Sequence, residues 1–78
     1  MPTVLRIGPY RFYFYSNESH EPPHIHVDRD GSSAKFWLKK VSLAGNIGFN
    51  QKELNLLGKL VMENQKILLG EWHERFGS

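Results

Sequence analysis

Residues 24–38 read HIHVDRDGSSAKFWL, and this stretch decides the fold of the chain. Apolar and polar side chains alternate on both sides of Asp30-Gly31, which is a favoured two-residue turn between antiparallel strands. With such a turn, Arg29 lies opposite Ser32, and this pairing fixes the register of the two strands. The stretch therefore predicts a β-hairpin with one apolar face and one polar face.

The rest of the first half predicts further strands. Gly8-Pro9 is a turn signal between two runs that are rich in β-branched and aromatic residues. The prolines at 22 and 23 favour an extended entry into the central hairpin, after a polar loop at 16–21. The expected strands cover residues 3–7, 10–15, 24–27, 34–38 and, as a short fifth strand, 41–44, followed by a turn at 45–48.

The second half predicts helix. Asn50 followed by Glu53 is typical of a capping box, and Phe49 with Leu54 is typical of a hydrophobic staple. Gly77 is a typical helix stop. An apolar stripe with helical spacing runs between them. Its members are Leu54, Leu57, Leu60, Val61, Ile67, Leu68, Trp72 and Phe76.

Length constrains this helix. One helix over residues 51–76 would measure about 39 Å, whereas a domain of this size is only about 30 Å across. The helix must therefore break or find a partner, and Gly58 and Gly70 are its weak points. We expect an α+β fold in one domain, residues 1–78. A small antiparallel sheet of four to five strands (1–44, two hairpins) would pack on a kinked or broken C-terminal helix (50–76).

Composition excludes several classes of protein. The chain has 78 residues, no Cys, four His and a formal net charge of +2. The absence of Cys excludes disulfides, thiolate metal sites and a Cys nucleophile. We expect no signal peptide, and no apolar stretch approaches the roughly 18 residues of a membrane span. A cytoplasmic protein without membrane association is the expectation.

Alternation also assigns the faces of the sheet. In the central hairpin, Ile25 pairs with Phe36 on the face that should meet the helix. If both hairpins join in one sheet, the opposite face, here called the outer face, carries cations interleaved with aromatic side chains. They are Arg6, Arg11, Tyr13, Tyr15, His24, His26, Lys35 and Trp37.

Such a face suits single-stranded nucleic acid. Arg and Lys contact phosphates, and each aromatic ring stacks on a base at roughly 1–3 kcal/mol. Two other interpretations stay open: a protein interface, where Tyr and Trp are common, and the ordinary solvated face of an antiparallel sheet. The expected substrate-binding residues are Arg6, Arg11, Tyr13, Lys35 and Trp37.

Three of the four histidines fall within residues 20–26. His24 and His26 stand at i and i+2 and therefore share one side of a strand. One neutral and one protonated imidazole at these positions are the expected catalytic pair, base and acid, for cleavage of an RNA phosphodiester bond. Lys35 or Arg11 would then stabilise the charge that develops on the phosphate.

The same cluster offers a metal-binding alternative. Zn²⁺ is bound in proteins by imidazoles and carboxylates, so His24 and His26 could hold it with His20 or Glu21 as a third ligand. A structural or binding role for the histidines is a third interpretation. We expect no resident cofactor, with zinc as the alternative. The sequence contains no Gly-rich phosphate loop, nucleophile elbow or dinucleotide-binding fingerprint.

Several strings of the chain are distinctive. They are MPTVLR at 1–6, GPYRF at 8–12, HEPPHIHV at 20–27, AKFWL at 34–38 and WHE at 72–74. Together they resemble the small bacterial family known as domain of unknown function 4160, over nearly the whole chain. This resemblance implies one half of a compact two-gene module of the toxin–antitoxin kind, often beside family 2442, another family of unknown function. It carries no catalytic residue to this chain.

These observations together give two hypotheses of function. The first is a component of a bacterial toxin–antitoxin module, as a ribonuclease-type toxin or an RNA-binding protein. The alternative is a non-catalytic protein-binding module, an antitoxin or adaptor, that uses the aromatic sheet face. The expected partners are a small cognate protein encoded nearby and RNA. A helix longer than the domain is also a reason to expect a homodimer.

Overall fold

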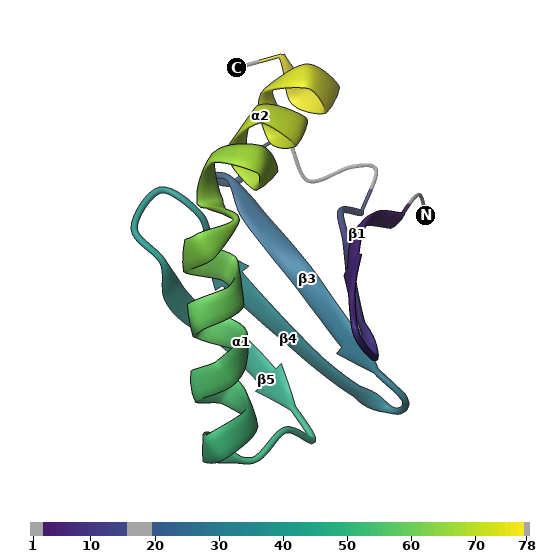
Figure 1. Ribbon diagram of the computed structural model, residues 1–78. Helices are drawn as coiled ribbons and strands as arrows, with labels where there is room; N and C mark the ends of the chain where they lie inside the picture. Colours follow the sequence, from purple (N-terminus) through teal and green to yellow (C-terminus); the bar gives the residue numbers. More distant parts are fainter. Residues whose placement is uncertain (1–2, 16–19, 78) are drawn as a thin grey trace.

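The computed structural model describes residues 3–15 and 20–77, and it shows a five-stranded antiparallel sheet followed by two helices (Figure 1). The expected α+β fold is confirmed, whereas positions 16–19 of the expected polar loop lie outside the described residues. The strands pair in chain order. The elements are β1 (Thr3–Ile7), β2 (Tyr10–Tyr13), β3 (His24–Arg29), β4 (Ser32–Trp37), β5 (Ser42–Ile47), α1 (Gln51–Glu63) and α2 (Gln65–Phe76).

The central hairpin, β3 and β4, has the predicted register. Arg29 pairs with Ser32, and Ile25 pairs with Phe36. Asp30 takes a left-handed backbone conformation with φ 54°, which Asp tolerates better than most residues. The apolar face of this hairpin is therefore the one that meets α1.

The first hairpin joins the same sheet. Gly8 turns the chain with φ 56°, and Ile7 pairs with Tyr10 across the turn. Strand β2 then pairs with β3, where Phe12 lies opposite Val27. Both hairpins consequently contribute apolar side chains to one core and polar side chains to one outer face.

Strand β5 differs from the expectation. Residues 45–48 are predicted as a turn, but the strand continues to Ile47 and Gly45 pairs with Lys35. The chain turns only at Gly48, where φ is 93°. Backbone pairing along β4 outweighs the turn propensity of these residues, as tertiary context often does.

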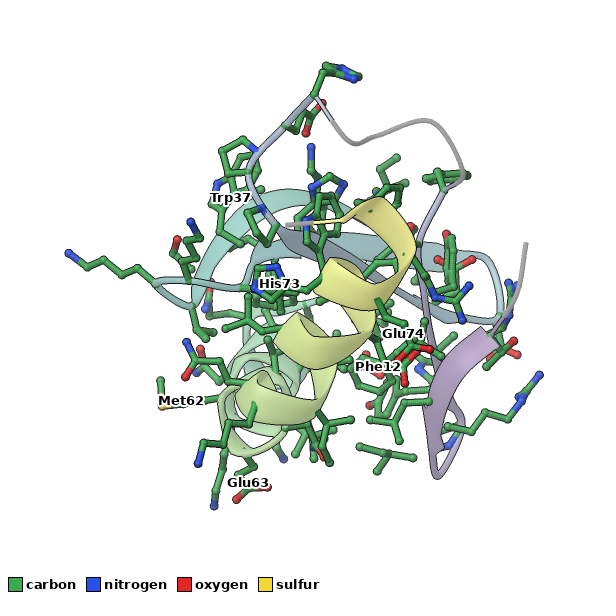
Figure 2. All side chains as sticks on the ribbon, turned by 90° about the horizontal axis from the view of Figure 1, so that it is seen from above. Phe12, Trp37, Met62, Glu63, His73 and Glu74 are labelled. Atoms are coloured by element: carbon green, nitrogen blue, oxygen red, sulfur yellow. The ribbon has the colours of Figure 1, made fainter. Side chains whose placement is uncertain are left out.

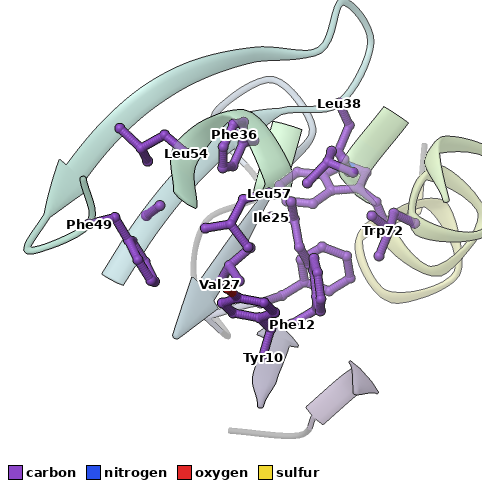
Figure 3. Close-up of a cluster of buried hydrophobic side chains, with 14 residues drawn as sticks. Tyr10, Phe12, Ile25, Val27, Phe36, Leu38, Phe49, Leu54, Leu57 and Trp72 are labelled. Atoms are coloured by element: carbon purple, nitrogen blue, oxygen red, sulfur yellow. The ribbon is translucent and has the colours of Figure 1, made fainter. Parts of the chain in front are cut away.

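The core lies between the sheet and the helices (Figure 3). Asn50 caps α1 as predicted, since its Oδ1 accepts a hydrogen bond from the Glu53 N–H at 2.9 Å. Gly77 ends α2 as predicted, with φ 80° and its N–H on the His73 carbonyl at 2.8 Å. The buried apolar side chains are Tyr10, Phe12, Phe14, Ile25, Val27, Ala34, Phe36, Leu38, Phe49, Leu54, Leu57, Val61, Leu68 and Trp72.

The predicted helix is broken, but not at either glycine. The break lies at Asn64, whose φ of −108° and ψ of 14° leave the helical region. Gly58 and Gly70, the expected weak points, both lie inside helices, so that prediction is wrong. Neither helix of the part described is long and apolar enough to cross a bilayer.

Side-chain hydrogen bonds explain the position of the break. The Asn64 amide donates to the Leu60 carbonyl at 2.8 Å, a local bond that competes with the regular helix pattern. The next residue, Gln65, donates to the Leu38 carbonyl at 2.6 Å and so ties the start of α2 to the end of β4. After the break, α2 leaves the line of α1 and lies past the end of the sheet at which β3 begins (Figure 1).

Glu53 links α1 to the sheet. Arg29 donates two hydrogen bonds to its carboxylate, one of them from Nη2 to Oε1 at 2.8 Å, and the Tyr10 hydroxyl donates to Oε2 at 2.8 Å. Hydrogen bonding to Arg29, followed by the bond from Tyr10, holds the pKa of Glu53 below its ordinary value. The carboxylate therefore stabilises the fold above the unfolded-state pKa of Glu53, and this stabilisation is lost as the pH falls through the lower folded-state pKa.

We predict that Glu53→Gln lowers the free energy of unfolding at neutral pH. The deficit relative to the wild type should shrink as the pH falls through the lowered pKa of Glu53, because the wild-type carboxyl then also becomes neutral. Urea unfolding at neutral and at acidic pH checks this. Glu63→Gln, on an exposed position of α1, is the matched control and should change little. A deficit that is independent of pH would contradict the prediction.

Candidate functional site

The outer face is not the open platform that the alternation pattern suggests. His24 is fully buried, Tyr13 is 4% exposed and His26 is 9% exposed. Arg11, Lys35 and Trp37 are partly buried, whereas Arg6 and Tyr15 are exposed. The residues share the predicted face, but only part of that face can meet a ligand.

His24 is held from three sides. Its Nδ1 lies 2.9 Å from the Pro22 carbonyl oxygen, and because a carbonyl only accepts, Nδ1 carries a proton. The imidazole contacts the rings of Trp37 and Trp72, with centroids 5.8 and 5.0 Å away. Its Nε2 is buried from solvent. One member of the expected catalytic pair is therefore packed against α2, out of reach of a substrate in solution.

His26 lies at the centre of an aromatic cluster. Its ring stacks on Tyr13 at 5.5 Å with an interplanar angle of 24°, and meets the edge of Tyr15 at 4.5 Å. The His24 ring is 5.1 Å away and almost perpendicular. These contacts fix the orientation of the His26 imidazole, of which only a small part is exposed.

Tyr13 supports His26 rather than offering a free ring. Its hydroxyl donates to Asp28 Oδ1 at 3.0 Å, and the Arg11 guanidinium lies 4.5 Å from the ring centroid. Burial, followed by hydrogen bonding to Tyr15 and Asp28, raises the pKa of the Tyr13 phenol. The phenol stays protonated at neutral pH, and the ring, between Arg11 and His26, has no open face for a base.

Glu21 is the shared anion of the cluster. Its Oε1 accepts a hydrogen bond from Lys35 Nζ at 2.6 Å and lies 3.7 Å from His24 Nδ1, while its Oε2 lies 3.9 Å from His20 Nε2. Lys35 also lies over the Trp37 ring, 4.7 Å from the centroid. An ammonium has three donor hydrogens, so the bond to Glu21 leaves donors for another acceptor.

A cleft of about 260 Å³ opens beside His26, here called the His26 cleft. Tyr15, His26 and Lys35 contribute to its wall from a loop and two neighbouring strands. Since liquid water occupies about 30 Å³ per molecule, there is room for a phosphate group. The lining residues are Tyr15, His26, Ser33, Ala34, Lys35, Gly45, Asn46 and Ile47.

The cleft brings together only some of the predicted site residues. His26 and Lys35 line it, whereas Arg6 and Arg11 face each other on β1 and β2, toward the other edge of the sheet. Tyr15 is a cleft residue that the expected binding set omits, although its place on the outer face follows from alternation. Asn46 also lines the cleft, because β5 continues where a turn was predicted.

The C-terminal WHE string divides between core and surface. Trp72 is buried and packs edge-to-face on Phe14 at 5.5 Å, whereas His73 and Glu74 are exposed on α2 (Figure 2). Within residues 3–15 and 20–77, no group of three or more His, Asp or Glu is arranged to hold a metal ion. The zinc alternative with His20, Glu21, His24 and His26 stays a prediction.

We predict that His24 stabilises the fold. His24→Ala should lower the free energy of unfolding by about 2–4 kcal/mol, because it leaves a cavity between two tryptophans and removes a buried hydrogen bond. His73→Ala, on the exposed side of α2, should stay within about 0.5 kcal/mol of the wild type. Urea unfolding of both variants measures the difference. Equal stability of the two variants would contradict the structural role of His24.

No curated protein and no solved structure gives a significant match to the chain. A family model, described as domain of unknown function (DUF4160), matches residues 10–73, which include every strand after β1 and all of the His26 cleft. The match covers well over half of the sequence, and the chain therefore belongs to the DUF4160 family.

Proposed function

We propose that the chain is an RNA-binding component of a toxin–antitoxin module, and that the His26 cleft holds a phosphate of the RNA backbone. The module is what the family resemblance implies, and this part of the proposal rests on that resemblance alone. RNA binding is supported by the chemistry of the cleft. Its ammonium, imidazole and phenol are the groups that contact phosphates and bases of single strands.

The presence of Tyr15, His26 and Lys35 in the wall of one cleft is the observation that carries the proposal. Lys35 Nζ is fixed between the Glu21 carboxylate and the Trp37 ring, so it is oriented before a ligand arrives. His26 is likewise held by Tyr13 and Tyr15. Ordered donors lose little conformational entropy on binding, which favours affinity for an anion.

In this proposal, Tyr15 is the residue on which a base stacks. Tyr15 is the exposed aromatic residue of the cluster, and its ring borders the cleft. Tyr13 is enclosed by Arg11 and His26, while Trp37 meets Lys35 and His24. A base beside the bound phosphate would therefore stack on Tyr15.

Arg6 and Arg11 extend the binding surface. They pair across β1 and β2, and neighbouring strands are about 4.8 Å apart. They lie too far from the cleft for the same phosphate but within reach of an adjacent stretch of backbone. A strand of RNA would then cross the sheet from the cleft toward the exposed Arg6.

Binding is proposed here in preference to cleavage. Cleavage through a 2′-hydroxyl needs a base and an acid at the phosphate. His26 borders the cleft, but the Nε2 of His24 is buried against aromatic rings. The burial of His24 favours a function that needs one accessible imidazole over one that needs two.

We predict that Lys35→Gln reduces the salt dependence of RNA binding. Each lost phosphate contact lowers the slope of log affinity against log salt by about one and weakens binding to all sequences alike. Fluorescence anisotropy with a labelled single-stranded RNA, measured between about 50 and 200 mM salt, reads this slope. Lys66→Gln makes the same change on an exposed position of α2 and should keep the wild-type slope.

Two outcomes of this titration would count against the proposal. The first is an absence of RNA binding by the wild type at low salt. The second is an equal loss of slope in Lys35→Gln and Lys66→Gln, which would indicate diffuse charge attraction without a site. Breakdown of the labelled RNA by the wild type, lost in His26→Asn, would replace binding by cleavage.

We further predict that Tyr15→Ala weakens RNA binding by about 1–3 kcal/mol, the usual contribution of one stacked base. The salt slope should stay as in the wild type, because no phosphate contact is removed. The same anisotropy titration measures both quantities. If the affinity of Tyr15→Ala matches that of the wild type, the base does not stack at this position.

A further inference from the structure

Strand β5 is an edge of the sheet whose sequence carries neither a charged side chain nor a proline. Edge strands present unpaired backbone groups, and proteins guard them with charged side chains or proline. β1, at the opposite edge, contains Arg6. β5 reads SLAGNI, with no charge and no proline, and its two large apolar side chains, Leu43 and Ile47, are 47% and 71% exposed.

A bulge in β5 directs these two side chains to opposite faces. Gly45 pairs with Lys35 and Leu43 pairs with Phe36, so Ala44 is the extra residue at which the register shifts. If β5 paired regularly, without this register shift, Leu43 and Ile47 would lie on the same face, because strand side chains alternate. The bulge places Leu43 on the helix side and leaves Ile47 on the outer face.

Each of the two apolar side chains borders a different cavity. Ile47 lines the His26 cleft on the outer face. Leu43 lines a groove of about 440 Å³ between β5 and α1, here called the α1 groove. The α1 groove is mainly apolar at its base. Its lining residues are Phe36, Val41, Ser42, Leu43, Gln51, Leu54, Asn55, Gly58, Lys59 and Met62.

Three lysines lie next to β5 in the sequence or in the α1 groove. Lys39 and Lys40 precede β5 and are exposed, and Lys59 stands in the lining of the α1 groove. None of the three forms an ion pair with another residue of the part that the structure describes. The edge is therefore apolar at Leu43, basic at its rim, and without a carboxylate of its own.

We propose that β5 accepts an extended segment of a partner protein as a sixth strand, with apolar residues toward the α1 groove and acidic residues near Lys39 and Lys40. Backbone hydrogen bonds to an exposed edge supply affinity, and the alternate side chains supply specificity. Charge favours an acidic partner over a second copy of this chain. Because β5 has no acidic residue, a second copy of this strand would leave the lysines without a counter-charge.

A strand at this position would also affect the outer face. Gly45, Asn46 and Ile47 belong both to β5 and to the wall of the His26 cleft. A partner on β5 would thus lie beside the place proposed for RNA. Docking itself does not depend on RNA binding, because it follows from the edge, the α1 groove and the lysines alone.

A synthetic peptide tests this docking. The probe is a capped peptide of about six residues, the usual length of a strand, in which Val and Glu alternate. In a two-dimensional NMR titration without RNA, it should shift the backbone amide signals of Ser42–Ile47 and slow their hydrogen exchange. A peptide with Lys in place of Glu should bind at least about tenfold more weakly, or 1.4 kcal/mol.

Matched variants distinguish binding at β5 from non-specific binding of the peptide. Leu43→Lys should weaken binding of the Val–Glu peptide by at least about tenfold, since it places a charge at the mouth of the apolar groove. Ile67→Lys makes the same change on α2, where Ile67 is 56% exposed, and should bind like the wild type. Both variants change exposed positions, so circular dichroism should show the native fold in each.

Several results would overturn the proposal. One is the absence of shifts in β5 at saturating peptide, and another is equal affinity of Leu43→Lys and the wild type. A dimer of the protein alone in sedimentation, dissociated by Leu43→Lys, would assign the edge to a second copy instead. Because RNA is absent from these measurements, their failure leaves the RNA titrations to be decided separately.

Discussion

The break in the helix at Asn64 is the constraint on which the rest of the structure depends. A continuous helix over residues 51–76 would measure about 39 Å, whereas the longest dimension of the molecule is 33 Å. The amides of Asn64 and Gln65 satisfy carbonyls at the break and at the end of β4. Helix α2 can then place Trp72 on Phe14 and His24, closing the core at the end of the sheet.

Because α2 closes the core at this end of the sheet, two histidines that stand two residues apart have different surroundings. Trp72 covers His24, so the first imidazole belongs to the core and holds the entry of β3 through the Pro22 carbonyl. His26 lies two residue pairs further along β3 and β4, between two tyrosines and beside the cleft. Two chemically identical side chains on one face of one strand thus have different surroundings, because only one of them lies under the helix.

Sequence reasoning succeeded where local rules dominate. The Asp30-Gly31 turn fixed the register of the central hairpin, and alternation then placed His26 opposite Lys35 as observed. Contacts between residues far apart in the sequence could not be predicted in this way. No local pattern shows that Gln65 would bond to the end of β4, so the break was assigned to glycines by propensity alone. The burial of His24 depends on the same break and was missed for the same reason.

The bulge at Ala44 has a consequence for how this surface can change during evolution. In a regular strand Leu43 and Gly45 would share a face, but the extra residue in the bulge lets Leu43 pair with Phe36 on the helix side. Loss of Ala44 would leave Leu43 directly before Gly45, still opposite Phe36 and on the helix side, so the deletion would remove the bulge without moving Leu43. A single-codon deletion at the bulge would therefore straighten the strand and keep Leu43 and Ile47 on their two surfaces.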